Sequence, residues 1–82
     1  MTQLQFKELE LSERMEVINQ NGLFASQRSY YNHDINLYTL FGFFVEVWYA
    51  NFENRISKIL IVQRPLVDKF YLEKIDISSL LN

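Results

Sequence analysis

The stretch that decides the fold is Gly42-Phe43-Phe44-Val45-Glu46-Val47-Trp48-Tyr49. Six of its eight residues are β-branched or aromatic, a composition typical of a pleated, buried strand. Successive side chains of a strand point to opposite faces, so one face is wholly apolar and the other carries two aromatic rings around one carboxylate, Glu46. A small antiparallel sheet usually turns its second face to water. An apolar second face therefore indicates a cover, which is a helix, a partner or a ligand.

The residues around this strand, 43–50, predict three more strands, at 23–31, 36–41 and 55–63. A tight two-residue reversal ending at Gly42 places Leu40 opposite Phe43 and Tyr38 opposite Val45, which gives a coherent apolar face. The alternative is one continuous, bent strand with a bulge at Gly42.

Polar segments predict the other two turns. Asn32-His33-Asp34 is rich in residues whose short side chains bond the nearby backbone. The segment 51–54 predicts a hairpin loop in which Asn54 takes a positive φ, because asparagine tolerates that conformation better than most residues.

Two helices are predicted, at 12–21 and 66–75. Ser12 is expected to cap the first, and Gly22 to end it in the left-handed conformation. Pro65 suits the start of the second, and an apolar stripe follows it. The segment 4–11 is consistent with an extended arm or a helical extension, and 75–78 with a short strand or the end of the helix. We therefore expect one α+β domain over 1–82: a four-stranded antiparallel β-meander flanked by an N-terminal and a C-terminal helix.

Composition limits the class of protein. The 82 residues include no cysteine and one histidine, which excludes disulfides, thiolate metal sites and histidine clusters, so we expect no metal and no cofactor. The formal net charge is only −2. No basic segment followed by an apolar one begins the chain, and no apolar run approaches the roughly 20 residues of a membrane helix. We expect a soluble, cytoplasmic protein that does not bind membranes.

Catalytic residue sets are absent from the sequence. The two glycines, Gly22 and Gly42, are too far apart for a phosphate-binding loop. His33 next to Asp34 could be a general base, but a histidine between polar turn residues is more often an exposed one. We expect no enzyme activity and no small-molecule substrate.

Glu46 is the most informative carboxylate, because burying it between Phe44 and Trp48 without a partner would be costly. One interpretation is a half-exposed glutamate beside a cross-strand cation such as Lys58. The other is an acid within an aromatic frame that receives an arginine or lysine of another chain.

Aromatic residues are more numerous than a core of this size readily hides, which favours a non-catalytic protein–protein interaction module. The candidate partner-binding residues are Phe44, Glu46, Trp48, Arg28 and Tyr30. The alternative is a nucleic-acid-binding sheet whose rings stack bases, built from Arg28, Tyr30, Tyr31, Tyr38, Phe44, Trp48 and Arg55. An isoelectric point near 5.2 argues against that alternative.

A chain of this size without disulfides or metal is often stabilised by self-association. Pairing two copies would bury the second sheet face, and Trp48 there offers a large apolar area. We expect a homodimer with Trp48 or its neighbours at the contact. The alternative is a monomer in which the helix 66–75 covers that face.

Overall fold

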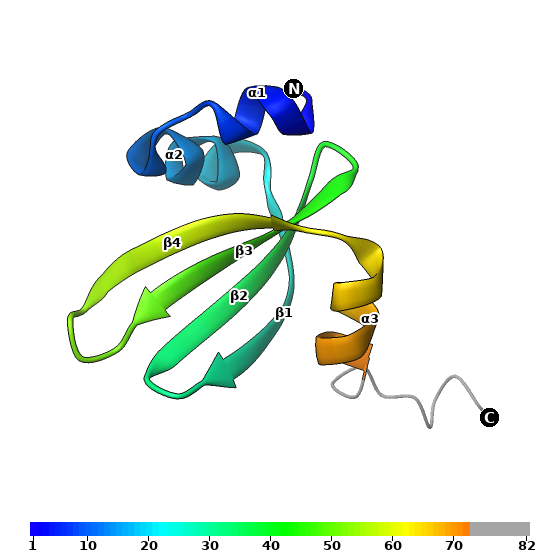
Figure 1. Ribbon diagram of the computed structural model, residues 1–82. Helices are drawn as coiled ribbons and strands as arrows, with labels where there is room; N and C mark the ends of the chain where they lie inside the picture. Colours follow the sequence, from blue (N-terminus) through cyan, green and yellow to red (C-terminus); the bar gives the residue numbers. More distant parts are fainter. Residues whose placement is uncertain (73–82) are drawn as a thin grey trace.

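Four antiparallel strands form one sheet whose spatial order is the sequence order, so the predicted meander is confirmed. The strands are β1 (Leu23–Tyr30), β2 (His33–Leu40), β3 (Phe43–Ala50) and β4 (Arg55–Val62). The helices are α1 (Gln3–Lys7), α2 (Leu11–Asn21) and α3 (Arg64–Tyr71). The computed structural model describes residues 1–72 and shows an α+β fold with α1 and α2 on one side of the sheet and α3 at its other side (Figure 1).

The β2–β3 hairpin has the predicted register, with Leu40 opposite Phe43 and Tyr38 opposite Val45. Its loop is two residues long, and both have positive φ, 50° at Phe41 and 85° at Gly42. Two positive φ angles in a two-residue loop match the twist of the flanking strands. The alternative of a bulge at Gly42 is therefore wrong.

The β1–β2 turn lies earlier than predicted. It consists of Tyr31 and Asn32, and β2 begins at His33 instead of residue 36. His33 pairs with Tyr30 on one side and Ala50 on the other, and Asp34 also belongs to the ladder. Pairing to a strand on each side outweighs the turn preference of these polar residues. The predicted positive φ of Asn54 is confirmed, at 53°.

The start of α2 differs from the prediction. The helix begins at Leu11, with Glu10 at the cap position, so Ser12 is not the cap. The Glu13 carboxylate accepts the backbone N–H of Glu10 at 3.0 Å. A glutamate three residues after the cap satisfies that N–H as in a capping box.

Gly22 ends α2 in an extended conformation, with φ −79° and ψ 148°, so the predicted left-handed cap is wrong. Its N–H still bonds to the carbonyl of Ile18 at 2.7 Å. A Cβ atom at residue 22 would lie 2.7 Å from that same carbonyl oxygen. Close approach to the helix, not a positive φ, is what requires glycine here.

The segment before α2 forms a separate short helix, α1, so the extended-arm interpretation is wrong. The hydroxyl of Thr2 accepts the N–H of Gln5 at 3.1 Å, and the Gln5 side chain accepts the N–H of Thr2 at 2.8 Å. This reciprocal cap starts the helix. The helix then buries Phe6, whose side chain is almost fully enclosed.

The C-terminal helix, α3, begins at Arg64, two residues before the prediction, with Pro65 in its first turn. Proline is accepted there because its missing N–H would have no partner in the helix. Val67 and Tyr71 form the buried side of α3. The predicted end of this helix at residue 75, and the segment 75–78, lie outside the described residues.

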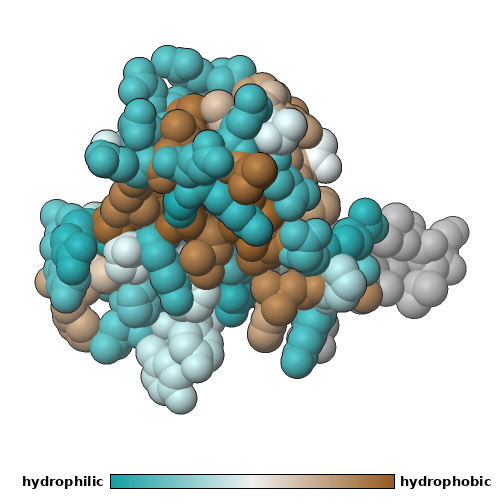
Figure 2. All heavy atoms as spheres, turned by 45° about the horizontal axis from the view of Figure 1, so that its top comes forward, coloured by the Kyte–Doolittle hydropathy of each residue, from teal (hydrophilic) through white to brown (hydrophobic). Residues whose placement is uncertain are grey.

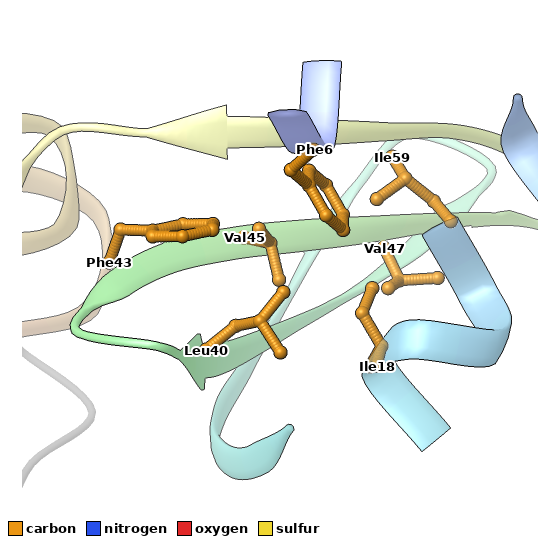
Figure 3. Packing of buried hydrophobic residues seen from close by; sticks show 7 residues of the cluster. All are labelled: Phe6, Ile18, Leu40, Phe43, Val45, Val47 and Ile59. Atoms are coloured by element: carbon orange, nitrogen blue, oxygen red, sulfur yellow. The ribbon is translucent and has the colours of Figure 1, made fainter. Parts of the chain in front are cut away.

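The main core lies between the sheet and the two N-terminal helices. It contains Phe6, Ile18, Leu40, Phe43, Val45, Val47 and Ile59 (Figure 3). The rings of Phe6 and Phe43 meet edge to face with centroids 5.9 Å apart. On the side that carries α1 and α2, apolar residues show between polar ones at the surface (Figure 2).

The other sheet face is covered over one half. Val67 and Tyr71 of α3 pack with Leu37, Val62 and Phe44 in a second apolar cluster. A helix is therefore the cover at the Phe44 end of this face, as one of the sequence-based alternatives had it. None of the helices within residues 1–72 has the length and apolar character that crossing a membrane requires.

Candidate functional site

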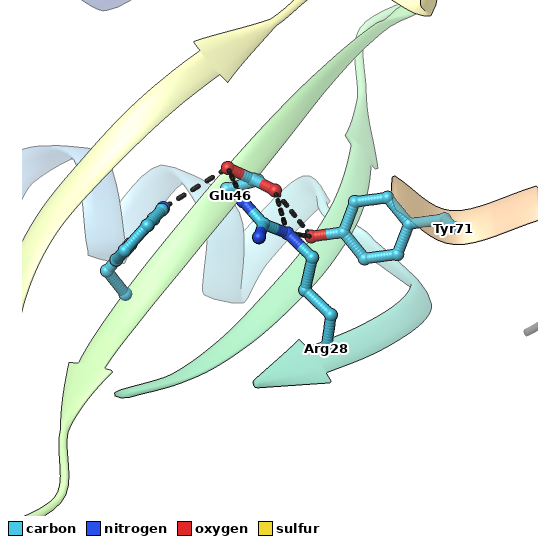
Figure 4. Close-up of polar contacts among 4 residues, drawn as sticks. Arg28, Glu46 and Tyr71 are labelled. Carbon is cyan, nitrogen blue, oxygen red and sulfur yellow. Dashed lines mark hydrogen bonds and ion pairs between the residues drawn. The ribbon is translucent and has the colours of Figure 1, made fainter. Parts of the chain in front are cut away.

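Glu46 lies at the centre of a buried polar network on the α3 side of the sheet (Figure 4). Its Oε2 atom is 3.0 Å from Nε of Arg28 and accepts the hydroxyl of Tyr71 at 2.5 Å. Its Oε1 atom accepts the indole N–H of Trp48 at 3.1 Å. Glu46 is 1% exposed, so the interpretation of it as a half-exposed glutamate beside Lys58 is wrong.

Burial and pairing together set the ionisation of this network. Arg28 is only 8% exposed and forms an ion pair with Glu46, so the partner of Glu46 comes from the same chain. Burial works against the charged form of Arg28, but its hydrogen bonds to Glu46 and Tyr71 leave its pKa raised. Burial, and then the hydrogen bond to Glu46, raises the pKa of Tyr71 well above its usual 10.0. The tyrosine therefore stays a neutral donor to a charged acceptor.

Beyond this network the sheet face carries four rings that α3 leaves uncovered, which we call the aromatic platform: Tyr30, Tyr31, His33 and Trp48. Ring centroids are 4.6 Å apart for Tyr30 and Tyr31, and 5.9 Å apart for Tyr30 and Trp48. His33 lies 5.5 Å from Trp48. Tyr30 is 51% exposed and Tyr31 is 85% exposed, so the platform presents ring surface to solvent.

Two cations flank the indole of the platform. The ammonium of Lys58 lies 3.9 Å from the centroid of Trp48, and the guanidinium carbon of Arg28 lies 5.4 Å from it. Both distances suit a cation–π interaction. Arg28 belongs to the ion pair with Glu46, whereas Lys58 is exposed and has no ion pair within residues 1–72.

A shallow hollow of about 370 Å³ continues the platform past His33. Its lining includes Phe52, Glu53 and Arg55, and the last two form an exposed ion pair of 2.7 Å. Asp34 does not face this hollow, because it follows His33 on the same strand and points to the other face. The predicted alternative of a general base oriented by Asp34 is therefore not assembled. Within residues 1–72 no group of three or more potential metal ligands comes together.

The five predicted partner-binding residues lie in three places. Tyr30 and Trp48 come together in the platform, Arg28 and Glu46 lie beside it in the buried network, and Phe44 packs against α3. Sequence reasoning did not connect His33 and Tyr71 with this region, and it named Tyr31 only for the nucleic-acid alternative and Lys58 only as a cation beside Glu46. No protein-family model, no curated protein and no solved structure matches this chain.

Proposed function

We propose that this protein is a non-catalytic interaction module that binds another protein through the aromatic platform. The observation that carries the proposal is one contiguous array of four rings on the half of the sheet face that α3 leaves open. Aromatic side chains that keep rigid, partly exposed ring surface are the usual anchors of protein interfaces. The neighbouring buried network supports the array by holding the indole of Trp48 through Glu46.

The backbone at Tyr31 supports the same proposal. A bulky aromatic residue at a φ of 52° is a sterically unfavourable choice for a turn. The side chain of Tyr31 is 85% exposed, so burial does not offset that cost. Phe41 has a similar φ of 50°, but its side chain is only 46% exposed. Backbone strain that burial does not offset concentrates at functional positions.

The chemistry of the platform defines the partner segment. The rings offer apolar contact, and the exposed ammonium of Lys58 beside Trp48 offers a charge to an acid. A carboxylate next to an aromatic or aliphatic side chain would meet both. We therefore propose a partner that presents an acidic residue within an apolar segment.

Nucleic-acid binding is the second candidate, because a lysine beside an indole also suits a phosphate next to a stacked base. Against it, three arginines that could meet phosphate groups are already in ion pairs: Arg28 with Glu46, Arg55 with Glu53 and Arg64 with Asp68. Recognition of the phosphate backbone of a nucleic acid depends on several cations acting together. A protein partner needs only the one that Lys58 supplies.

The proposed setting is the cytoplasm, which suits a chain without cysteine. Self-association as a homodimer is part of the proposal, because the core of so small a chain gives a thin margin of stability.

Intrinsic fluorescence can test the platform directly, since Trp48 is the only tryptophan. A displayed library of random peptides is selected on the protein, and the enriched peptides are titrated while Trp48 emission is followed. We expect enrichment of acidic residues next to aromatic or aliphatic ones, with saturable changes in emission. Single-stranded oligonucleotides are titrated in parallel at two salt concentrations, and salt-sensitive binding to them alone would contradict the proposal.

Two turn variants provide a matched comparison. Tyr31 and Phe41 are each the first residue of a two-residue turn, with φ of 52° and 50°, at opposite ends of the sheet. Asparagine tolerates this conformation, so Tyr31→Asn and Phe41→Asn should both fold. Selected peptides should bind the Tyr31→Asn variant at least several-fold more weakly and the Phe41→Asn variant as well as the wild type. Equal binding to both variants would remove Tyr31 from the site.

A further inference from the structure

The two edge strands of the sheet, β1 and β4, differ in the contacts that other residues make with their outer backbone groups. At β4, Nη1 of Arg14 donates to the carbonyl of Ile59 at 2.9 Å, and Nη2 of the same side chain donates to the carbonyl of Lys7 at 2.7 Å. The guanidinium thus occupies an edge carbonyl and ties it to the end of α1. An edge that is covered in this way is closed to a further strand.

Among residues 1–72 no side chain hydrogen-bonds to the backbone of β1, which is the last strand on its side of the sheet, and α3 approaches this strand at Ala25 and Ser26. Its eight residues, Leu23-Phe24-Ala25-Ser26-Gln27-Arg28-Ser29-Tyr30, include no lysine and no proline. The one charge, Arg28, is buried against Glu46. Leu23 and Phe24 are 71% and 61% exposed. Long, uncharged edges of this kind are the ones that pair with other chains.

Backbone alternation shows which groups the β1 edge offers. Tyr30 and His33 flank a two-residue turn and therefore form a hydrogen-bonded pair. The alternation then turns the N–H and C=O of Gln27 and Ser29 away from β2. At Ala25 a register shift interrupts the ladder, so the straight, pairable stretch runs from Ser26 to Tyr30.

From these observations we infer that β1 pairs antiparallel with β1 of a second copy of this chain, joining two four-stranded sheets into one. The inference rests on the homodimer proposed above and specifies its contact, and it does not depend on the aromatic platform. A two-fold axis beside Gln27 makes this part of the edge its own complement, because the outward N–H and C=O of Gln27 meet those of Gln27 of the partner subunit. It places Arg28 opposite Ser26 of the partner subunit, so no charged residue faces a like charge.

Disulfide trapping tests this register, because the wild-type chain contains no cysteine. Residues that face each other in a hydrogen-bonded antiparallel pair have Cα atoms about 5.5 Å apart, within the range that a disulfide spans. Under mild oxidation the Gln27→Cys variant should form a covalent dimer. The matched control is Leu60→Cys, an exposed position on the opposite edge strand, which should stay monomeric. Trapping through residue 60 instead of 27 would overturn the inference.

Sedimentation of the unmodified protein gives the second test. We expect a species of twice 9.9 kDa at micromolar concentration, and a shift towards 9.9 kDa in Gln27→Lys, because two lysines would meet at the axis. Gln27→Glu, which brings two carboxylates together at the axis, serves if Gln27→Lys fails to fold by circular dichroism. A 9.9 kDa wild type at every concentration would overturn the inference. Protection of the Gln27 and Ser29 amides in that monomer would show that the chain covers its own edge.

Discussion

The hydroxyl of Tyr71 lies 2.5 Å from Oε2 of Glu46, so a buried hydrogen bond joins the last turn of α3 to the middle of the sheet. The same carboxylate accepts the indole N–H of Trp48 through its other oxygen. One side chain of β3 therefore contacts both the helix that covers one half of the face and the ring at the centre of the exposed half. The docking of α3 and the orientation of Trp48 are coupled through Glu46.

Replacement of Glu46 should destabilise the fold strongly. In Glu46→Gln the guanidinium of Arg28 stays buried without its counter-charge, which we expect to lower the free energy of unfolding by about 3–5 kcal/mol in urea titrations. The double variant Arg28→Met with Glu46→Leu should recover much of this loss, since it leaves no unpaired charge. The control is Glu53→Gln in the exposed pair with Arg55, where a loss of roughly 1 kcal/mol or less is expected.

Removal of the Tyr71 hydroxyl should act in a pH-dependent way. At neutral pH, Tyr71→Phe should cost about 1–3 kcal/mol, because Glu46 loses a buried donor. The pKa of Tyr71 is raised in the folded protein, so its contribution is complete below the unfolded-state value of about 10 and is lost as the pH rises above it.

The difference in unfolding free energy between wild type and Tyr71→Phe should therefore shrink as the pH is raised above about 10. Urea titrations at a series of pH values measure it. A difference that stays constant or grows with pH would show that the hydroxyl does not donate to Glu46. Tyr31→Phe, at an 85% exposed ring, should leave the stability at neutral pH unchanged.

Arg14→Met should loosen the N-terminal helices and uncover the β4 edge. Methionine keeps much of the apolar stem, but the carbonyls of Ile59 and Lys7 both lose their donor. We expect a loss of about 1–3 kcal/mol and faster amide exchange in α1 and along β4. Lys7→Met removes an exposed side chain and keeps the backbone carbonyl, so it should leave exchange unchanged. Equal effects of the two substitutions would mean that loss of positive charge, not of the bridge, is responsible.

The two glycines should respond differently to substitution. Gly22→Ala places a methyl group 2.7 Å from the carbonyl oxygen of Ile18, which should cost about 1–3 kcal/mol through forced displacement. Gly42→Ala meets no atom within 4 Å but carries a φ of 85°, which should cost about 1–2 kcal/mol. Asparagine separates the two causes in thermal unfolding: Gly42→Asn should be milder than Gly42→Ala, and Gly22→Asn should be no better than Gly22→Ala.

The central hairpin could be predicted because its signals are local. Alternation in β3, a glycine at the reversal and cross-strand apolar pairs all lie within about a dozen residues, and the observed register agrees with them. The sequence-based reason for glycine at residue 22, a positive φ, is wrong, because the cause is a close contact with the preceding turn of α2. Both causes require the same residue, so the sequence does not distinguish them.

The partners of Glu46 could not be predicted from neighbours in the ladder. Lys58 is paired with Trp48 in register, and its ammonium turns to the indole ring instead of the carboxylate. Arg28 reaches Glu46 from β1, two strands away, and Tyr71 reaches it from α3. Such contacts depend on how the long side chains cross the face and where the helix docks, which a pairwise strand pattern does not contain.

The bridge made by Arg14 joins positions 45 residues apart in the chain, and its acceptor belongs to the last strand of the sheet. During synthesis α1 and α2 emerge first, yet the strands on which they dock come later, and β4 comes last of these. The helices are too short to be stable without that surface. The N-terminal helices therefore dock completely only after residue 59 has left the ribosome, and until then the edge that Arg14 covers is open to neighbouring chains. A low density of nascent copies would favour correct folding.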